Sequence, residues 1–235
     1  MALGASAALA VTKYLNDTLK NQAEARVVFA CAPSQDDFLA ALVARHRTHG
    51  EVDWERVTVF HMDEYLGLPR GHPQHFRNYL EQHLLRHIRV AQFYPILADG
   101  NGRSDYATQV MEKPVDLICM GIGENGHIAF NDPPLADFED RAWGRVVELD
   151  PACRQQQVND GCFPRLEDVP RRAYTLTIPV FRQAKRLNLH VPGVRKAAAV
   201  RAALLGPITP ACPASIVRPH ENATLYLDPD SASLL

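Results

Sequence analysis

The stretch that decides the fold of this chain is residues 115–134, which reads VDLICMGIGENGHIAFNDPP. Its apolar start, Val115 to Met120, has the composition of a buried strand. Three glycines follow directly, and glycine lets the backbone pass close to a ligand or adopt positive φ. Next comes His127, whose side-chain type has its ordinary pKa near neutrality. We therefore expect a strand that ends in a functional loop.

The glycines at 121, 123 and 126 spell G-x-G-x-x-G, which imitates a dinucleotide-binding turn. That fingerprint must open a helix, whereas Pro133 and Pro134 follow within two turns. Proline inside a helix removes a hydrogen bond and clashes with the preceding turn. The motif also lies in mid-chain, not at the first strand-to-helix turn. We therefore predict no nicotinamide or flavin cofactor at this turn.

Outward from this stretch, apolar runs rich in β-branched residues alternate with segments of helical period. This alternation is typical of a parallel sheet with crossover helices. We expect an α/β fold, Rossmann-like and three-layered, with a mostly parallel central sheet, helices on both faces and one domain over residues 1–235. The predicted strands are 26–31, 56–61, 115–120, 173–178, 186–191 and 223–227, and the predicted helices are 5–20, 35–46, 74–87, 106–111 and 195–205. The polar segment 150–171 contains three prolines and is predicted to be a mobile loop or lid.

Composition excludes several classes of protein. The chain of 235 residues is 46% hydrophobic, and its 25 basic and 27 acidic residues give a net charge of -2, so nucleic acid is not an expected partner. The apolar N-terminus lacks a basic region and is soon interrupted by Lys13, so we predict neither a signal peptide nor a membrane span, and a cytoplasmic location. The 5 cysteines form no C-x-x-C pair and are expected to be reduced thiols. A homo-oligomer is compatible with the sequence.

The ends of the predicted strands carry three polar clusters, and ligands of parallel sheets gather at those ends. The first cluster is the turn Ala32, Pro33, Ser34 and Gln35. Ser34 is predicted to cap the next helix with Asp37 as its capping partner. A helix start offers unpaired N–H groups that suit a phosphate, although an ordinary capped helix explains the same residues equally well.

The second cluster places Asp63 and Glu64 directly after an apolar strand. Adjacent residues of an extended chain point to opposite faces, so we expect one carboxylate to face the crevice and the other to brace a loop. A carboxylate in a partly desolvated pocket gains basicity, which suits proton abstraction from carbon. The alternative is a solvated, acid-rich turn before Gly67 and Pro69.

The third cluster is the opening stretch itself, where Asp132 is close enough in sequence to orient His127. A carboxylate behind a histidine fixes its tautomer and raises its basicity. A zinc site is less well supported, because no second ligand stands at a standard metal spacing from His127. We therefore predict no metal at this stretch.

Two segments carry a resemblance to a known family. The segment from Met62 to Pro69 reads MDEYLGLP, and residues 121–133 read GIGENGHIAFNDP. Both closely resemble the signature segments of the glucosamine-6-phosphate deaminases, also called isomerases. The resemblance implies a deaminase/isomerase-type fold and a hydrolase that converts glucosamine 6-phosphate and water to fructose 6-phosphate and ammonia, without a cofactor, in amino sugar catabolism. The related 6-phosphogluconolactonases share the fold and the G-x-G-x-x-G-H core, so hydrolysis of a phosphosugar lactone is the alternative.

The resemblance also implies roles for individual residues. Asp63 takes the proton from C2 of the open-chain sugar, His127 opens the pyranose ring, and Asp132 positions His127. Asn125 is counted with these catalytic residues, since it and Asp132 stand where many deaminases have an aspartate and a glutamate. The implied substrate and phosphate contacts are Ala32, Pro33, Ser34, Gln35, Glu64, Gly123, Gly126 and Lys196.

The chain departs from the family at two places that concern the phosphate. The turn at residues 31–35 lacks the glycine and threonine of many deaminases. A phosphate-binding arginine of some members has no clear counterpart, and Arg154 and Arg165 are the nearby candidates. A non-catalytic sugar-phosphate sensor is a third hypothesis, against which the joint presence of Asp63, His127 and Asp132 argues.

Overall fold

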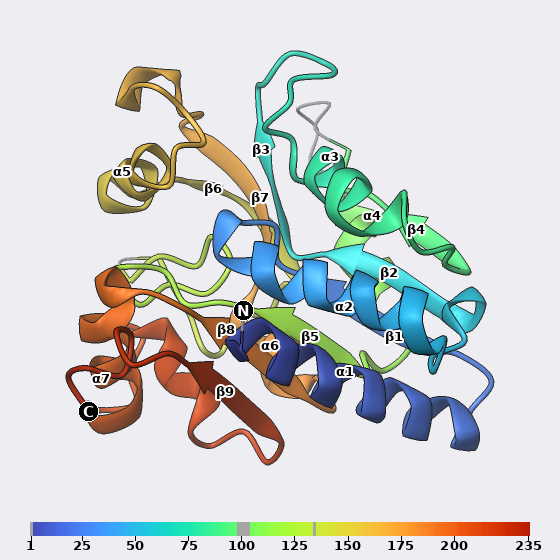
Figure 1. Cartoon of the computed structure of the whole chain (residues 1–235). Helices are drawn as coiled ribbons and strands as arrows, with labels where there is room; N and C mark the ends of the chain where they lie inside the picture. Colours follow the sequence, from blue (N-terminus) through green and yellow to red (C-terminus); the bar gives the residue numbers. More distant parts are fainter. Residues whose placement is uncertain (1, 98–103, 134) are drawn as a thin grey trace.

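The computed structural model describes residues 2–97, 104–133 and 135–235. Its centre is a six-stranded sheet in the order β4-β2-β1-β5-β8-β9, in which all paired strands are parallel (Figure 1). The strands are β1 (Ala25–Phe29), β2 (Val57–His61), β4 (Gln92–Tyr94), β5 (Leu117–Met120), β8 (Leu187–Val191) and β9 (Ala223–Leu227). The predicted α/β fold with a parallel central sheet is confirmed.

Helices cover both faces of this sheet, as predicted. One face carries α1 (Ala2–Asn21), α2 (Asp36–His49) and α3 (Phe76–Leu80), which a π-helical turn continues over Glu81–Leu85. The other face carries α4 (Ser104–Met111), α6 (Ile178–Gln183) and α7 (Ala197–Leu205).

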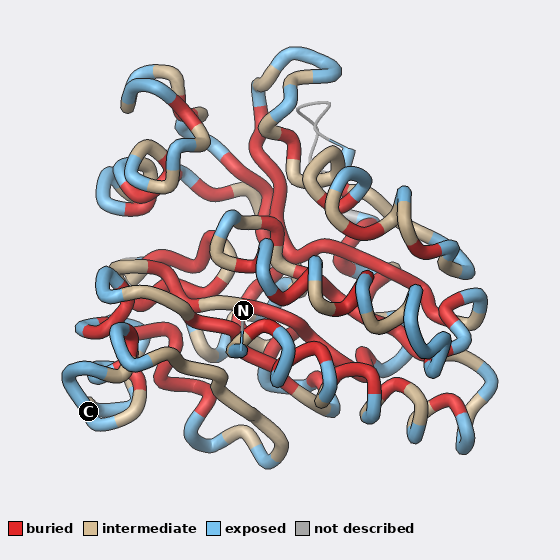
Figure 2. Tube along the Cα trace, viewed as in Figure 1, coloured by how far each residue is buried: buried red, intermediate tan, exposed pale blue. Residues whose placement is uncertain are grey.

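Strand side chains alternate between the two cores. Val27 packs in the core of α1 and α2, whereas Val28 packs in the opposite one. The buried residues therefore lie along the strands and on the sides of the helices that face the sheet (Figure 2).

The direction in which successive strands are added to the sheet reverses between β1 and β5. From β1 it proceeds through β2 to β4 on one side, and from β5 through β8 to β9 on the other. The loops after β1 and β5 therefore leave the sheet toward opposite faces and open a crevice between them. Parallel α/β sheets bind ligands at such a switch point.

A second, antiparallel sheet in the order β3-β7-β6 stands beside the C-terminal ends of the main strands (Figure 1). It consists of β3 (Asp63–Leu66), β7 (Arg172–Leu176) and β6 (Gly144–Glu148), and with α5 (Pro151–Asn159) it forms what we call the antiparallel lobe. The lobe has its own core, which includes Tyr65, Phe130 and Phe163. The expectation that residues 173–178 belong to the parallel sheet is wrong, because strand propensity does not specify the partner, and β7 pairs with β3 and β6.

The polar segment 150–171 is not a loop throughout, which corrects the second expectation. It contains α5 and a 3₁₀ turn at Leu166–Asp168. The Asp150 side chain accepts a hydrogen bond from the Ala152 N–H at 2.8 Å, and Pro151 opens the helix. This pairing of an N-cap with a first-turn proline is a helix-start signal that the prolines and polar composition had obscured.

The remaining predicted elements are confirmed with shifted ends. The predicted helices correspond to α1, α2, α3 with its π-helical continuation, α4 and α7, while β3, β4, β6 and α6 were not predicted. The single-domain organisation stays a prediction. Among the described residues, no helix is both long and apolar enough to cross a membrane.

Candidate active site

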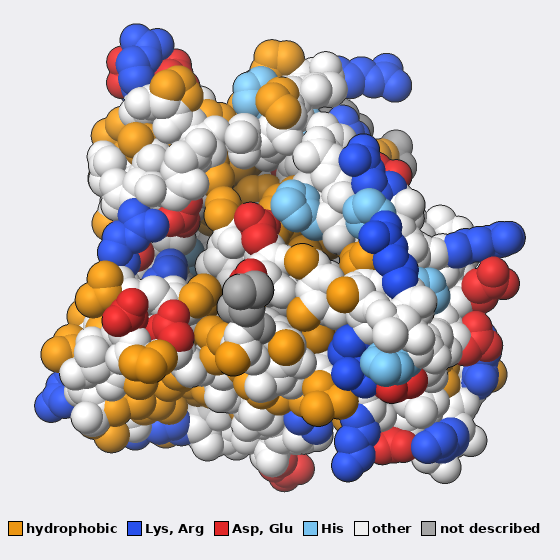
Figure 3. Space-filling view, viewed as in Figure 1, with side chains coloured by type: hydrophobic (Ala, Val, Ile, Leu, Met, Phe, Trp, Pro, Cys, Tyr) orange, Lys and Arg blue, Asp and Glu red, His pale blue; other side chains and the backbone are white. Residues whose placement is uncertain are grey.

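A pocket opens at the C-terminal ends of β1 and β5, at the switch point of the sheet. Its floor comes from the turn after β1 and the glycine loop after β5, and its wall from β3, α3, α5 and the turn before α7. In the space-filling view, acidic and basic side chains border a hollow between the antiparallel lobe and the main body (Figure 3). Of the predicted site residues, the pocket is lined by Ala32, Ser34, Gln35, Asp63, Gly123, His127 and Lys196.

The side chains of Asp63 and Glu64 point to opposite faces of β3, as expected for adjacent residues of a strand. Asp63 lines the pocket, and burial, reinforced by the charge of Glu64, raises the pKa of its carboxyl well above the ordinary value. Glu64 is fully buried on the opposite side of β3 and accepts hydrogen bonds from the N–H groups of Tyr65, Phe76 and Arg77 at 2.9, 3.1 and 3.2 Å. Glu64 thus braces the start of α3 and does not line the pocket, so its predicted substrate contact is not supported.

His127 lies in a hydrogen-bonded group with Asn125 and Asp132. Its Nδ1 is 2.7 Å from the Oδ1 of Asn125 and 3.2 Å from the Oδ1 of Asp132. Because Asn125 Oδ1 also accepts the backbone N–H of His127, its oxygen faces the ring, and both neighbours of Nδ1 are acceptors. The proton therefore resides on Nδ1, which leaves Nε2 as the basic nitrogen.

Asp132 and Asn125 lie behind the histidine and not on the pocket wall. Asp132 is fully buried and accepts hydrogen bonds from Asn125 Nδ2 at 3.1 Å and the Asp150 N–H at 3.3 Å. Burial alone would raise the pKa of Asp132, but the hydrogen bond and charge of His127, with the bonds from Asn125 and Asp150, hold it below the ordinary value. Asp132 therefore stays ionised and can stabilise a protonated His127.

The glycines of the loop serve two different purposes. A Cβ on Gly123 would lie 2.2 Å from His127 Cε1, so this position admits the imidazole ring. Gly126 has a φ of +84° and turns the chain, and it does not line the pocket. Residues 121–133 form turns and no helix, in agreement with the sequence argument against a dinucleotide site.

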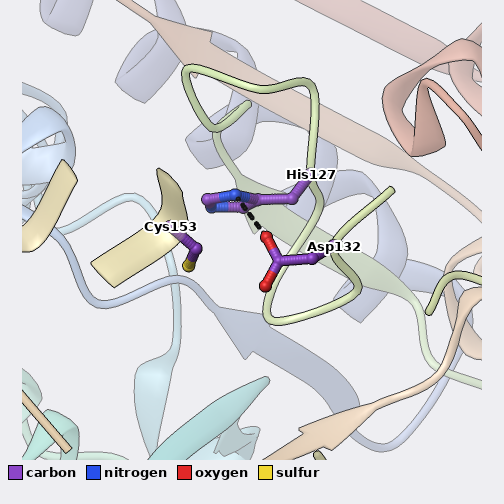
Figure 4. A group of neighbouring side chains, drawn as sticks. All are labelled: His127, Asp132 and Cys153. Atoms are coloured by element: carbon purple, nitrogen blue, oxygen red, sulfur yellow. Dashed lines mark ion pairs between the residues drawn. The ribbon is translucent and has the colours of Figure 1, made fainter. Parts of the chain in front are cut away.

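Cys153, on α5, approaches this group from the lobe. A ring nitrogen of His127, a carboxylate oxygen of Asp132 and the Sγ of Cys153 lie within 4.8 Å of one another (Figure 4). These are ligand types that bind zinc, and the spacing rule missed the set because Cys153 reaches it only through the tertiary fold. Burial, together with the nearby carboxylates of Asp132 and Asp63, raises the pKa of the Cys153 thiol well above the ordinary value. His127, Asn125 and Asp132 are held together by their hydrogen bonds and ion pair, and Cys153 lies beside them.

The turn after β1 differs from the capped helix that was expected. Pro33–Gln35 form a 3₁₀ turn, and α2 begins at Asp36 with no side-chain cap. Ser34 is therefore not the N-cap, because Pro33 starts the turn one residue earlier and places Ser34 inside it. Its Oγ instead accepts a hydrogen bond from Gln35 Nε2 at 3.1 Å, and both residues line the pocket, while Pro33 does not.

Lys196 supplies the positive charge of the pocket. It follows Gly193 in the 3₁₀ turn before α7 and is only 6% exposed. Burial lowers the pKa of its amine, partly offset by the charges of Asp160 and Glu124. A buried cation of this kind gains from the arrival of an anionic ligand.

Three arginines, Arg195, Arg154 and Arg165, are engaged in contacts outside the pocket. Arg195 contacts Asp160 at 2.7 Å and Glu124 at 3.2 Å. Arg154 donates to the carbonyl oxygens of Leu166 and Val169, and Arg165 pairs with Asp168. Neither Arg154 nor Arg165 lines the pocket.

Several lining residues were missed at the sequence level. These include Gln156 and Gln157 on α5, the aromatic residues Phe76 and Phe130, and Ala129, which has a φ of +50°. The positive φ of a residue with a Cβ is uncommon and marks a constrained turn beside His127. Gln156 and Gln157 could have been predicted as lining residues only if α5 had been recognised from its N-cap Asp150 and its first-turn Pro151.

Comparison with known proteins shows the family to which the chain belongs. The family model described as glucosamine-6-phosphate isomerases/6-phosphogluconolactonase matches residues 1–226. A glucosamine-6-phosphate deaminase of Exiguobacterium sibiricum is 38% identical over 188 residues, which cover 78% of this chain and 73% of the relative. Glucosamine-6-phosphate deaminase 2 of Bacillus subtilis is 36% identical over 195 residues, covering 79% and 76% of the two chains.

Solved structures give the same result for the fold. The structure of a monomeric glucosamine-6-phosphate deaminase superposes with a TM-score of 0.88 at 28% identity, over 99% of this chain and 95% of the other. A 6-phosphogluconolactonase of Shewanella baltica superposes with a TM-score of 0.75 at 16% identity, over 96% and 93%, and so shares the fold. On these matches, the chain belongs to the family of glucosamine-6-phosphate isomerases and 6-phosphogluconolactonases.

Proposed function

We propose that this protein converts glucosamine 6-phosphate and water to fructose 6-phosphate and ammonia. The observation that carries the proposal is that Asp63, His127 and Lys196 line one pocket although they come from three distant segments. The reaction needs a base that removes a proton from carbon, an acid-base group that transfers protons at the sugar oxygens, and a cation that binds the phosphate. The names of the relatives in this family support the same substrate.

The reaction begins with ring opening at His127. Its Nε2 accepts the proton of the C1 hydroxyl and returns a proton to the ring oxygen as the C1–O5 bond breaks. Asp132 and Asn125 keep the proton on Nδ1 during this exchange, and the ionised Asp132 stabilises the imidazolium that forms transiently. The product of this step is the open-chain amino aldose.

Asp63 then moves hydrogen between two carbons. Its carboxylate takes the proton from C2 while the C2 ammonium group gives a proton to O1, which yields an enolamine. The Asp63 carboxyl then returns its proton to C1, which yields the protonated ketose imine. Water adds at C2 and ammonia leaves, so atoms balance, and the net consumption of water makes the enzyme a hydrolase that proceeds through isomerisation. The raised pKa of Asp63 suits a base that must retain a proton long enough to return it.

Lys196 and Ser34 hold the phosphate end of the substrate. Lys196 provides the charge, and the Ser34 hydroxyl provides a donor from the turn after β1. Gln35 holds Ser34 in place, because its Nε2 donates to Ser34 Oγ and to the carbonyl oxygen of His190. This chemistry consists of proton transfers and requires no cofactor.

An ammonia-release assay over a panel of hexosamine phosphates tests the proposal. We expect ammonia and a ketose phosphate from glucosamine 6-phosphate. Acid release from a phosphosugar lactone without ammonia would instead indicate the lactonase, which has no need of a base for a C–H bond. Binding of the sugar phosphate without turnover would indicate the sensor.

A further inference from the structure

Helix α5 brings two adjacent glutamines to the pocket from the antiparallel lobe (Figure 1). The roles described so far do not involve either amide. Each is buried, with Gln156 6% and Gln157 8% exposed. A buried amide is costly unless its groups are satisfied, so the partners of each one indicate its role.

Both ends of the Gln156 amide are used within the protein. Its Oε1 accepts the backbone N–H of Glu124 at 2.8 Å, and its Nε2 donates to Asp160 Oδ2 at 3.3 Å. Gln156 therefore ties the glycine loop to the end of α5. Its role is structural.

Gln157 is different, because only one end of its amide has a protein partner. The hydroxyl of Tyr65 donates to Gln157 Oε1 at 2.7 Å. Within residues 2–97, 104–133 and 135–235, no hydrogen bond to a protein acceptor is found for Gln157 Nε2, and this nitrogen is not sealed from the pocket. A nearly buried donor thus remains available at the pocket wall.

Tyr65 determines which end of the amide faces the pocket. Its ring is fully buried and packs against Phe76, Phe130 and Phe163, with centroid distances of 4.7, 5.5 and 5.5 Å. Burial raises the pKa of the Tyr65 hydroxyl well above its ordinary value, so the hydroxyl keeps its proton and donates. Since Gln157 Oε1 is occupied by this bond, its NH₂ group points away from Tyr65, as a donor.

The position of Gln157 along α5 relates it to the catalytic group. It stands one helical turn after Cys153, whose Sγ lies within 4.8 Å of a carboxylate oxygen of Asp132 behind His127. It shares the pocket with Asp63, His127 and Lys196, and the apolar side chains of Met62, Phe76 and Phe130 also line this pocket. Under the proposed function, Lys196 binds the phosphate and Asp63 and His127 act at C1 and C2, so the hydroxyls of the intervening carbons need partners among the other residues that line this pocket.

We infer that Gln157 is a substrate-binding residue whose Nε2–H, oriented by Tyr65, donates a hydrogen bond to a hydroxyl oxygen of the sugar chain between C2 and the phosphate. This inference rests on the proposed function. Gln157 supplies a neutral donor for hydroxyls where Lys196 supplies charge for phosphate. Tyr65 is a positioning residue.

The test compares Gln157→Leu and Tyr65→Phe with the matched control Gln155→Leu, whose side chain is exposed on the same helix. Three quantities are measured: KM and kcat for glucosamine 6-phosphate, the affinity for 2-amino-2-deoxyglucitol 6-phosphate as a non-reacting open-chain probe, and the affinity for inorganic phosphate. For Gln157→Leu we expect KM to rise and probe affinity to fall about tenfold, the effect of losing one hydrogen bond, with phosphate affinity unchanged. Tyr65→Phe should cause a smaller change in the same direction, because the amide remains but can rotate.

The inference is overturned if Gln157→Leu binds the probe as wild type does, or if inorganic phosphate affinity falls equally, which would indicate a general structural defect. Thermal melts of the variants separate misfolding from lost contact. Failure of the proposed function would give a different result. Wild type would then release no ammonia, whereas the affinity for the probe would still report whether Gln157 contacts an open-chain sugar phosphate.

Discussion

The backbone of Gly123 lies directly against the imidazole ring of His127. A Cβ at position 123 would be 2.2 Å from Cε1, 2.3 Å from Nε2 and 2.4 Å from Nδ1 of that ring. The N–H of Gly123 also donates to the carbonyl oxygen of His127 at 2.9 Å. The second glycine of the G-x-G-x-x-G pattern thus makes room for the acid-base residue, and not for a pyrophosphate.

Gly123→Ala should therefore displace His127 and lower kcat by roughly 10²- to 10⁴-fold, the usual contribution of a positioned acid or base. Steady-state ammonia release measures the effect, and circular dichroism checks the fold. Gly50→Ala is the control: Gly50 has a φ of +59°, and no atom of the described residues lies within 4 Å of the added Cβ, so this change should cost about 1 kcal/mol of stability and leave kcat unchanged. Normal turnover of Gly123→Ala would contradict the role given to His127.

The neighbours Asp63 and Glu64 should separate activity from stability. Asp63→Asn removes the base in the pocket, so we expect kcat to fall by roughly 10²- to 10⁴-fold or more with substrate affinity largely kept. Glu64→Gln replaces a carboxylate that accepts three N–H bonds by an amide whose NH₂ group must face at least one of these donors, so the free energy of unfolding should fall by about 1–3 kcal/mol. Urea denaturation and kinetics on both variants give the comparison. A near-wild-type rate for Asp63→Asn would contradict the proposed role of Asp63 as the base.

Lys196→Met tests the phosphate site while filling the same buried space. We expect KM for glucosamine 6-phosphate to rise about 10- to 100-fold, the range for losing a hydrogen bond to a charged group. Stability should not fall, because burial already disfavours the charged amine of Lys196. Lys113→Met is the control, since Lys113 pairs with Glu24 at the exposed surface. An unchanged KM for Lys196→Met would remove Lys196 from the phosphate site.

His61 gives the protein a predictable sensitivity to acid. Its Nδ1 donates to the Asp63 carbonyl at 2.8 Å, and its Nε2 accepts the Ile96 N–H at 2.8 Å, so the neutral ring is fully satisfied. Burial lowers the pKa of His61 from 6.5 to about 4, against the opposing charge of Glu64. Because the folded pKa lies below the unfolded one, this stabilisation is present above pH 6.5 and is lost as the pH falls toward about 4.

The expected loss over that window is about 3 kcal/mol, at 1.36 kcal/mol per pKa unit. Urea denaturation of wild type and His61→Gln between neutral pH and the acid end of the window measures it, and the variant should show a shallower decline. His49→Gln, at an exposed position, should follow the wild-type curve. Equal slopes for wild type and His61→Gln would refute the assignment.

Much of the fold follows from local sequence pattern. The parallel strands and their helices were predictable because hydrophobic periodicity and β-branched runs are local properties. The split between Asp63 and Glu64 was predictable for the same reason, since a strand alternates its faces. The strand at 173–178 was found but assigned to the wrong sheet, because propensity carries no information about hydrogen-bonding partners.

The sequence by itself determined the α/β class, the strand-end loops and the two family segments that hold Asp63 and His127. Only the tertiary structure decided that α5 exists within a polar, proline-containing segment, that Ser34 lies inside a turn, and that Cys153 and Gln157 reach the site from the antiparallel lobe. The physical reason is that these contacts join residues far apart in the chain. The distances between these residues depend on how the antiparallel lobe packs over the ends of the strands, and this packing cannot be inferred from the spacing of residues along the sequence.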